Sequence, residues 1–434
     1  MTYLIYSFLF TLGVLLTAPY YIWKRRDELA AGQWRERFGQ LPESFQQGQR
    51  GAIWIHAVSV GETLAVDGLA RELQALAPER KIFLSGVTPA GRAAGESRLP
   101  WVAGRFYLPM DWRGAVRAAL GRIQPSLLVI VETELWPNLL RAAHEFGARV
   151  ILINARLSTR SFRRYRLLRP LMRRVLENVD RICAQTEADA ERFQHLGAAP
   201  ERVVLAGNLK FDSAPPRLAA FPRLLEEAVG LSGRGPVLIA ASTMPGEEEL
   251  VLEAWSKVRA QYPRALLILA PRHPARFDEV AQILTGAGHS HVRRAHLASQ
   301  APEISSQVAA SEVLLLDSIG ELAAVLELAE VVFMGGSLVP TGGHNILEAA
   351  YWAKPVVFGP HMENFQDIAR LFLEAEASIQ VQDAEGLAES VLELLADRAA
   401  ARRLGERAKQ VLEKQAGATA RVLEEIQRLL NSPR

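Results

Sequence analysis

A glutamate that follows a short apolar run is the first residue able to do chemistry. The run Ala52–His56 leads into the turn His56–Thr63, in which Gly61 precedes Glu62. A strand that passes through a glycine turn into a helix places Glu62 at the helix N-terminus, where a carboxylate can act as a general base. Alternatively, Glu62 only caps the helix and suits its dipole, an effect of about 0.3–1 kcal/mol. The local sequence leaves both roles open.

Two more carboxylates follow the apolar run Leu127–Val131. Glu132 and Glu134 lie on the same side of an extended segment and would repel each other in a dry site. Such a pair favours a bound substrate over a purely structural role. Lys210, in the segment Gly207–Asp212, adds a cation that can contact a phosphate, although a lone lysine can equally be only solvated.

Later turns have the composition of a nucleotide site. They are, in chain order, Pro271–Arg272, Asp317–Glu321, Gly335–Ser337 and Gly342–Glu348. The guanidinium group of Arg272 can donate two parallel hydrogen bonds to a phosphate. Glycines let backbone N–H groups approach an anion at a helix N-terminus. Asn345 with Glu348 three residues on also fits a variant capping box. Together the turns favour a nucleotide site.

The motifs that would hold a metal or a dinucleotide are absent from the sequence. There is no Walker lysine motif, no GxGxxG fingerprint and no convincing Asp-x-Asp, since Asp189–Glu191 falls inside a predicted helix. The nine histidines form no metal-binding pattern. We therefore expect no metal and no cofactor, and a donor substrate whose leaving group carries a single phosphate.

A long basic stretch follows Asn154. Its arginines are Arg156, Arg160, Arg163, Arg164, Arg166, Arg169, Arg173 and Arg174, and apolar residues such as Phe162 and Val175 are interleaved at roughly helical spacing. A basic amphipathic surface suits anionic lipid or phosphate groups. RNA is a conceivable partner and a solvated helix face is the alternative, but an apolar N-terminus makes membrane lipid the better partner.

The elements that must position these residues alternate between buried strands and helices. The predicted strands are Ala52–His56, Lys81–Ser85, Leu127–Val131, Val150–Asn154, Arg181–Ala184, Val237–Ala241, Ala265–Ala270, Val313–Asp317, Val331–Gly335 and Pro355–Gly359. Such alternation indicates parallel strands with crossover helices. The series occurs twice, so we predict an α/β chain with two Rossmann-like domains facing each other across a cleft.

The domain boundaries follow from this alternation and from composition. Residues 1–23 carry no charged side chain and can span a bilayer as a helix. Residues 24–212 form the first domain, the proline-containing segment 213–222 the linker, residues 223–400 the second domain, and residues 401–434 a helical tail. The basic Lys24–Arg26 would keep the body in the cytoplasm, with Tyr20, Tyr21 and Trp23 at the interface. We expect the anchor to contribute nothing to the cleft, so that the body stays folded and active without it.

Composition narrows the class further. The chain has 434 residues, is 49% hydrophobic and has a formal net charge of +2. That length can bury two cores, and the near-neutral charge gives no indication of nucleic acid. The single Cys183 excludes an internal disulfide and suits a reducing compartment.

In their combination and order, these segments resemble the 3-deoxy-D-manno-octulosonic acid (Kdo) transferases of Gram-negative lipopolysaccharide assembly, which are membrane-anchored glycosyltransferases of the GT-B fold. The resemblance extends over essentially the whole chain. The segments that carry it are His56–Thr63, Glu132–Asn138, Asn154–Arg160, Gly207–Asp212, Pro271–His273, Gly335–Ser337, Gly342–Glu348 and Gly359–Phe365.

The resemblance implies a role for each matching residue. Glu62 matches the family's catalytic base, and Glu132 and Lys210 match residues that stabilise the transition state. The residues that match the segments holding the CMP part of CMP-Kdo are Pro271, Arg272, Ile319, Gly320, Glu321, Asn345, Ile346, Leu347 and Glu348. Ile319 and Ile346 stand where other members can carry Met and Pro, which removes no chemistry.

The implied reaction is inverting, metal-independent transfer of Kdo from CMP-Kdo to a lipid A precursor (lipid IVA) at the cytoplasmic side of the inner membrane. A sugar-nucleotide epimerase of the GT-B fold is the alternative. An epimerase would have no use for a membrane anchor or for an arginine-rich surface.

Overall fold

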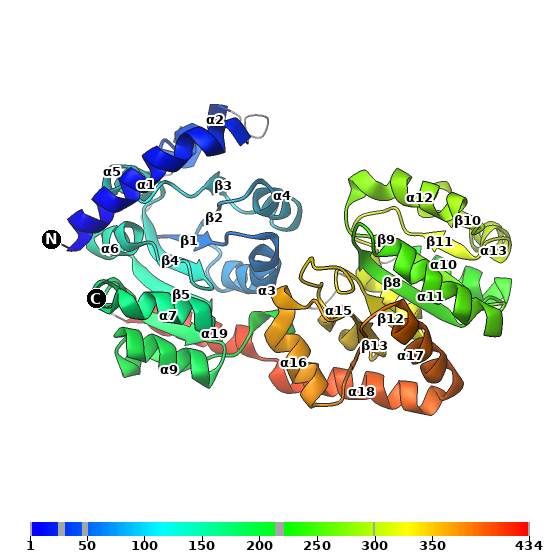
Figure 1. Cartoon of the computed structure of the whole chain (residues 1–434). Helices are drawn as coiled ribbons and strands as arrows, with labels where there is room; N and C mark the ends of the chain where they lie inside the picture. Colours follow the sequence, from blue (N-terminus) through cyan, green and yellow to red (C-terminus); the bar gives the residue numbers. More distant parts are fainter. Residues whose placement is uncertain (1, 25–30, 46–50, 213–220, 298–299, 433–434) are drawn as a thin grey trace. The chain divides into compact units, whose positions relative to one another are not determined.

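The computed structural model describes residues 2–24, 31–45, 51–212, 221–297 and 300–432 (Figure 1). Contacts divide the chain into two compact units. The first consists of Met1–Ser213 and Gln415–Arg434, and the second of Ala214–Lys414. Each unit contains one seven-stranded parallel sheet, which confirms the predicted α/β class.

The sheet of the first unit has the strand order β3-β2-β1-β4-β5-β6-β7. The strands are β1 (Ala52–His56), β2 (Ile82–Gly86), β3 (Gly104–Tyr107), β4 (Pro125–Val131), β5 (Arg149–Ala155), β6 (Arg181–Ala184) and β7 (Val203–Leu205). The order reverses direction between β1 and β4. In open parallel sheets, ligands bind outside the carboxyl ends of the strands at such a switch point.

Helices cover both faces of this sheet. They are α1 (Thr2–Lys24), α2 (Ala31–Arg37), α3 (Val60–Leu76), α4 (Pro89–Arg98), α5 (Arg113–Ile123), α6 (Pro137–Phe146), α7 (Thr159–Leu167), α8 (Arg169–Leu176), α9 (Glu187–Leu196) and α19 (Ala418–Asn431). Because successive side chains point to opposite faces, Trp54 packs into the core under α5, α6 and α8, whereas Ile53 packs into the core under α3 and α19.

The sheet of the second unit has the order β10-β11-β9-β8-β12-β13-β14. Its strands are β8 (Val237–Thr243), β9 (Leu266–Pro271), β10 (His291–Arg293), β11 (Val313–Leu315), β12 (Val331–Met334), β13 (Val356–Phe358) and β14 (Ile379–Gln380). Here the direction reverses between β8 and β12. The central strands are buried along their length, as expected for a parallel sheet covered on both faces.

The helices of the second unit complete the alternation. They are α10 (Phe221–Ser232), α11 (Glu248–Gln261), α12 (Phe277–Gly286), α13 (Ala301–Ala309), α14 (Leu322–Val325), α15 (Leu347–Tyr351), α16 (Gln366–Glu374), α17 (Ala384–Ala396) and α18 (Arg398–Gln415). Trp255 of α11 and Phe333 of β12 lie in one core cluster with Leu404 of α18.

All ten predicted strands are present, and each boundary is correct to within two residues. The prediction missed β3, β7, β10 and β14, which are the edge strands of the two sheets. An edge strand pairs on one side only and is short. The side chains of β7, β10 and β14 are mostly half-buried, so these strands lack the continuous apolar run that identifies a central strand.

The C-terminal tail is divided between the units. The predicted boundary at residue 400 falls inside α18, which belongs to the second unit up to Lys414, whereas α19 packs into the core of the first unit. Most of the predicted linker, residues 213–220, lies outside the described residues.

The N-terminal helix α1 lies along the first unit, beside α5 and α6 (Figure 1). Hydrogen bonds of 3.0 Å join it to the unit at three places: Tyr3 to Arg174, Ser7 to Asn138, and Thr11 to Trp112. These residues recur every three to four positions and so share one helix face. The helix therefore packs against the first unit, a contact that the sequence did not predict.

The opposite face of α1 is apolar and exposed. It carries Leu4, Ile5, Phe8, Leu9, Leu12, Leu15 and Leu16, each at least 43% exposed. By length and composition, Thr2–Pro19 is able to cross a membrane. The predicted interfacial side chains of Tyr20, Tyr21 and Trp23, and the basic Arg25 and Arg26, lie outside the described part of the chain.

Candidate active site

The predicted catalytic residues of the first unit all follow carboxyl ends of strands in one sheet. Glu62 follows β1, Glu132 follows β4, and Lys210 follows β7. Since β1 and β4 are the two strands at which the order reverses, Glu62 and Glu132 stand at the position where such sheets bind ligands.

The Glu62 side chain completes a capping box at the start of α3. Its Oε2 accepts the Val58 backbone N–H at 2.7 Å, and its Oε1 accepts the Ser59 hydroxyl at 2.9 Å. The Ser59 Oγ accepts the Glu62 backbone N–H in return. The capping role considered from the sequence is therefore present. It leaves a second lone pair on each carboxylate oxygen for another donor.

Burial shifts the pKa of the Glu62 carboxyl group. The residue is 8% exposed, and this desolvation raises the pKa of its carboxyl above the usual 4.5, helped by the negative charges of Glu132 and Glu134. The hydrogen bonds from Val58 and Ser59 act in the opposite direction but do not cancel the effect. A carboxylate whose pKa is raised is a stronger base, which is the property that general base catalysis requires.

Glu134 has the opposite environment. Burial acts to raise the pKa of its carboxyl, but His56 and the Trp136 indole outweigh it and hold that pKa below the usual value. The indole Nε1 donates to Glu134 Oε2 at 2.8 Å. Nε2 of the fully buried His56 lies 3.8 Å from the same oxygen, beyond hydrogen-bond distance. Glu134 is thus kept ionised close to Glu62.

Glu132 is held in an unusual backbone conformation. Its φ of 57° lies in the left-handed region, which non-glycine residues adopt only where the surroundings enforce it, often at functional sites. Its backbone N–H donates to the Ile153 carbonyl at 2.9 Å. Its Oε1 lies 3.6 Å from Lys210 Nζ, so the two predicted transition-state residues form an ion pair.

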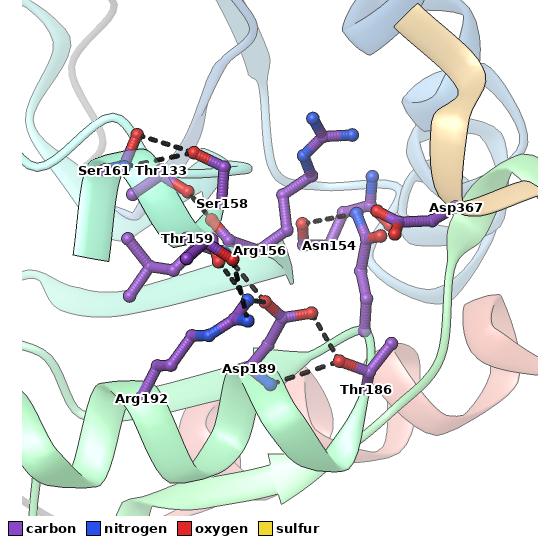
Figure 2. A network of polar contacts seen from close by, with 12 residues as sticks. Thr133, Asn154, Arg156, Ser158, Thr159, Ser161, Thr186, Asp189, Arg192 and Asp367 are labelled. Atoms are coloured by element: carbon purple, nitrogen blue, oxygen red, sulfur yellow. Dashed lines mark hydrogen bonds and ion pairs between the residues drawn. The ribbon is translucent and has the colours of Figure 1, made fainter. Parts of the chain in front are cut away.

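The adjacent strand end contains a polar network that the sequence did not reveal. Asn154 is fully buried with φ 51°, and its Oδ1 accepts the Leu209 N–H at 3.0 Å. Beyond it, Asp189 accepts the Leu157 N–H at 2.8 Å, and Thr133 donates to the Arg156 carbonyl (Figure 2). Sequence position alone could not pair Asp189 with Leu157, because the contact joins the first turn of α9 to the loop after β5.

In the second unit, Pro271 ends β9 and Arg272 follows it. Pro271 is buried, Arg272 is exposed, and the Arg272 backbone N–H donates to the Thr243 carbonyl at 2.9 Å. Burial lowers the pKa of the neighbouring His344 to about 4, and the charges of Arg272 and His273 contribute. His344 is therefore neutral at pH 7. Arg272 and the predicted loop around Asn345 thus lie close together.

The predicted segment Ile319–Glu321 also lies at this edge, after β11. Glu321 accepts both Nε and Nη2 of Arg294 at 2.9 Å and also accepts the Ser318 hydroxyl. Gly320 has φ 88°, which suits glycine, and Ile319 is 80% exposed. The helix that follows, α14, has only one turn.

The Gly335–Ser337 loop does not offer its amides to an anion from outside. The carboxylate of the fully buried Glu247 accepts the N–H groups of Gly336, Ser337 and Leu338 at 2.6–2.9 Å, and that of Met244 at 3.1 Å. The sequence-based hypothesis that these glycine-loop amides bind a phosphate is therefore wrong for this segment, because an internal carboxylate already occupies them.

The Asn345–Glu348 segment does not form the capping box considered from the sequence. Asn345 Oδ1 accepts the Leu347 N–H at 3.3 Å, and the residue that precedes α15 is Ile346. Ile346 and Leu347 are buried and hold the loop in the core, whereas Asn345 and Glu348 are half-buried. α15 is only five residues long, so it offers little helix dipole to an anion.

Among the described residues, no group of three or more His, Cys, Asp or Glu side chains is arranged to hold a metal ion. Asp189 and Glu191 lie within α9, as predicted from the sequence. Cys183 is buried within β6, and burial raises the pKa of its thiol to about 12, so it is no nucleophile.

Two doubly wound parallel sheets in one chain define the GT-B fold, and solved structures agree. The chain is similar to a putative UDP-N-acetylglucosamine 2-epimerase from Listeria monocytogenes, with a TM-score of 0.58 and 12% identity over 89% of this chain and 98% of that one. A UDP-GlcNAc 2-epimerase from Neisseria meningitidis gives a TM-score of 0.57 with 13% identity, over 87% of this chain and 100% of that one. At such identity the likeness shows the fold alone.

Sequence relatives decide the family. The family model described as 3-deoxy-D-manno-octulosonic-acid transferase (kdotransferase) matches residues 32–213. A 3-deoxy-D-manno-octulosonic acid transferase of Bordetella pertussis is 37% identical over 96% of this chain and 98% of its own length, and one of Haemophilus influenzae is 34% identical over 86% of each. The chain belongs to the Kdo transferase family and is a glycosyltransferase.

Proposed function

We propose that this enzyme transfers Kdo from CMP-Kdo to a lipid A precursor (lipid IVA), with inversion at the anomeric carbon and without a metal or cofactor. The observation that carries the proposal is Glu62: a buried carboxylate with a raised pKa, positioned at the switch point of the first sheet. Membership of the Kdo transferase family supplies the donor sugar.

Glu62 is assigned the role of general base. A sugar hydroxyl has a pKa far above 7, so a positioned base must take its proton as the new bond forms. The acceptor oxygen attacks the anomeric carbon of Kdo, its proton passes to Glu62, and the bond between that carbon and the CMP phosphate oxygen breaks. CMP leaves with the electron pair.

The remaining residues are assigned to binding and to charge stabilisation. In the first unit, the Glu132–Lys210 ion pair is assigned to the transition state. In the second unit, Pro271, Arg272, Ile319–Glu321 and Asn345–Glu348 are assigned to CMP. Fixed cations can stabilise the charge that develops on a departing phosphate, and Arg272 is exposed and without a carboxylate partner among the described residues.

The membrane role is assigned to α1 and to the arginines of α7 and α8. Arg163, Arg164, Arg166 and Arg169 are exposed, as are Leu167 and Leu168 of the same surface. A basic surface with apolar residues suits anionic lipid, and no nucleic acid is proposed as a partner. Docked as it is, α1 would meet the cytoplasmic face of the inner membrane with its apolar side, because spanning the bilayer would break its contacts with the first unit.

One assay tests the reaction against the epimerase alternative. The protein is incubated with CMP-Kdo and a tetraacylated lipid A precursor, and both CMP release and Kdo-bearing lipid are measured. We expect CMP and glycosylated lipid in equal amounts. Conversion of a sugar nucleotide without any transfer to lipid would instead support an epimerase, and the absence of both reactions would refute the proposed donor and acceptor.

A further inference from the structure

Arg156 differs from the other arginines of the basic stretch in where it lies. It follows β5 directly, at the carboxyl end of the sheet, and it precedes α7 and α8, which carry the others. It is half-buried, whereas Arg160, Arg163 and Arg164 are exposed. The strand before it, β5, pairs with β4, and Glu132 follows β4 directly. Arg156 is therefore next to the candidate catalytic strand end.

The peptide bond that follows Arg156 is held at both of its ends by hydrogen bonds (Figure 2). On one side, Thr133 donates its hydroxyl to the Arg156 carbonyl. On the other side, Asp189 Oδ1 accepts the Leu157 N–H at 2.8 Å. Since Thr133 lies in the turn after β4 and Asp189 in the first turn of α9, the two contacts fix the chain where Arg156 leaves β5.

Asp189 is itself held in place. It is 6% exposed, its Oδ2 accepts the Thr186 hydroxyl at 2.6 Å, and its Oδ1 lies 3.5 Å from Arg192 Nη1. Arg192 also donates to the Leu157 carbonyl. A buried carboxylate that is satisfied by three partners is a rigid support for the loop that begins at Arg156.

The guanidinium of Arg156 has no such partner among the described residues. Figure 2 shows its side chain extending away from Asp189 and Arg192. Three other half-buried arginines of this unit pair with carboxylates: Arg92 with Glu36 at 2.7 Å, Arg149 with Asp180 at 3.2 Å, and Arg181 with Glu425 at 2.8 Å. A half-buried cation is costly to leave unpaired, and five N–H donors in a planar fork match an oxyanion.

Asn154 adds a second donor at the same strand end. Its Oδ1 faces the Leu209 N–H, which fixes the orientation of the amide and leaves Nδ2 as a donor. Nδ2 is buried and has no partner among the described residues. Most buried polar groups are hydrogen-bonded, so an unsatisfied one at a candidate site calls for an explanation.

We propose that Arg156 binds an oxyanion of the substrates through its guanidinium fork, either a phosphate of the acceptor or the carboxylate of the donor sugar. The inference rests on the proposed function and deepens it. Asp189, Thr133 and Arg192 are positioning residues that act through the backbone of Arg156. The exposed arginines of α7 and α8 take no part in this contact.

The test compares Arg156→Gln and Arg156→Lys with the parent enzyme. Arg98→Gln is the matched control, because Arg98 is also half-buried and without a carboxylate partner among the described residues, but it ends α4, at the opposite edge of the sheet from the site. Initial rates are measured with CMP-Kdo and two acceptors, the phosphorylated lipid A precursor and its dephosphorylated form, while thermal melting monitors the fold.

We expect Arg156→Gln to lower kcat/KM about tenfold or more, as for loss of charge-assisted hydrogen bonds. Arg156→Lys should lie in between, because it keeps the charge and loses the fork, and neither variant should change the melting temperature. A loss confined to the phosphorylated acceptor assigns the contact to the acceptor phosphate. An equal loss with both acceptors, with a higher KM for CMP-Kdo, assigns it to the donor carboxylate.

Either of two results overturns the inference. Rates of Arg156→Gln within twofold of the parent with both acceptors would show a solvated arginine. A large fall in melting temperature in both Arg156 variants would show a structural role instead. If the parent enzyme itself produces no Kdo-bearing lipid, the proposed function fails, whatever Arg156 does.

Discussion

Replacing Glu62 with Gln tests the proposed base directly. The amide keeps the shape of the side chain and one oxygen, which can still accept the Val58 N–H. The new NH2 group faces the Ser59 hydroxyl, which can rotate from donor to acceptor. The cap at the start of α3 therefore survives in neutral form, while the proton acceptor is lost.

The two consequences differ greatly in size. Exchanging a charged hydrogen bond for a neutral one costs about 1 kcal/mol of stability, and removing a buried charge offsets part of that. A domain with the usual stability of about 5–15 kcal/mol stays folded after such a loss. Loss of a general base lowers turnover by about 10²–10⁴-fold, equivalent to about 2.7–5.4 kcal/mol in the barrier. Unfolding therefore cannot account for the expected loss of rate.

The assay measures kcat from CMP release with saturating CMP-Kdo and lipid acceptor. CMP affinity should be unchanged, because the residues assigned to CMP lie in the second unit. Glu72→Gln is the matched control, since Glu72 is an exposed glutamate on the same helix. We expect Glu62→Gln to turn over at least about a hundredfold more slowly than Glu72→Gln. If the two variants differ by less than about threefold, Glu62 only caps the helix, and the base must be sought elsewhere.

Three further predictions follow from the described contacts. Activity requires ionised Glu62, so it should fall as the pH drops through the raised pKa of this carboxyl. Because the Glu134 charge helps to raise that pKa, Glu134→Gln should shift the acid limb of the kcat/KM profile to lower pH. An acid limb that stays in place would contradict the electrostatic effect of Glu134 on Glu62. Activity should survive EDTA, and a complete loss that Mg²⁺ restores would reveal a metal site. Replacing the exposed arginines with Gln should weaken binding to anionic vesicles strongly at low salt and less at high salt, at about 1 kcal/mol per charge, whereas equal binding at every salt concentration would show a solvated face. The four to replace are Arg163, Arg164, Arg166 and Arg169.

The sequence predicts the central strands well because burial on both faces leaves a continuous apolar run. Ala52–His56 and Arg181–Ala184 coincide with β1 and β6. The edge strands carry no such signal. The path of the last helix was equally invisible, because α19 joins the first unit through contacts far away in sequence, such as those of Val422.

For the candidate site, the sequence identifies which residues could act but not their partners. The capping role of Glu62 could be predicted from the sequence because a capping box is local and spans only four residues. The Glu247 carboxylate could not be predicted to occupy the amides of Gly336 and Ser337, because that contact crosses about ninety positions of the chain. The left-handed φ of Glu132 likewise results from packing, and the local sequence contains no glycine or turn motif that would predict it.

The docking of α1 gives the N-terminal helix a second consequence, within the catalytic unit itself. Phe10 meets the Trp136 ring edge-on with centroids 6.3 Å apart, and the Trp136 indole donates to Glu134, whose charge acts on Glu62. Deleting the helix would leave the Trp136 ring without this partner and free to choose another rotamer. A truncated enzyme would then differ from the full chain in the electrostatics around Glu62, and its pH profile would show that difference. This effect would come in addition to the loss of the contact with lipid.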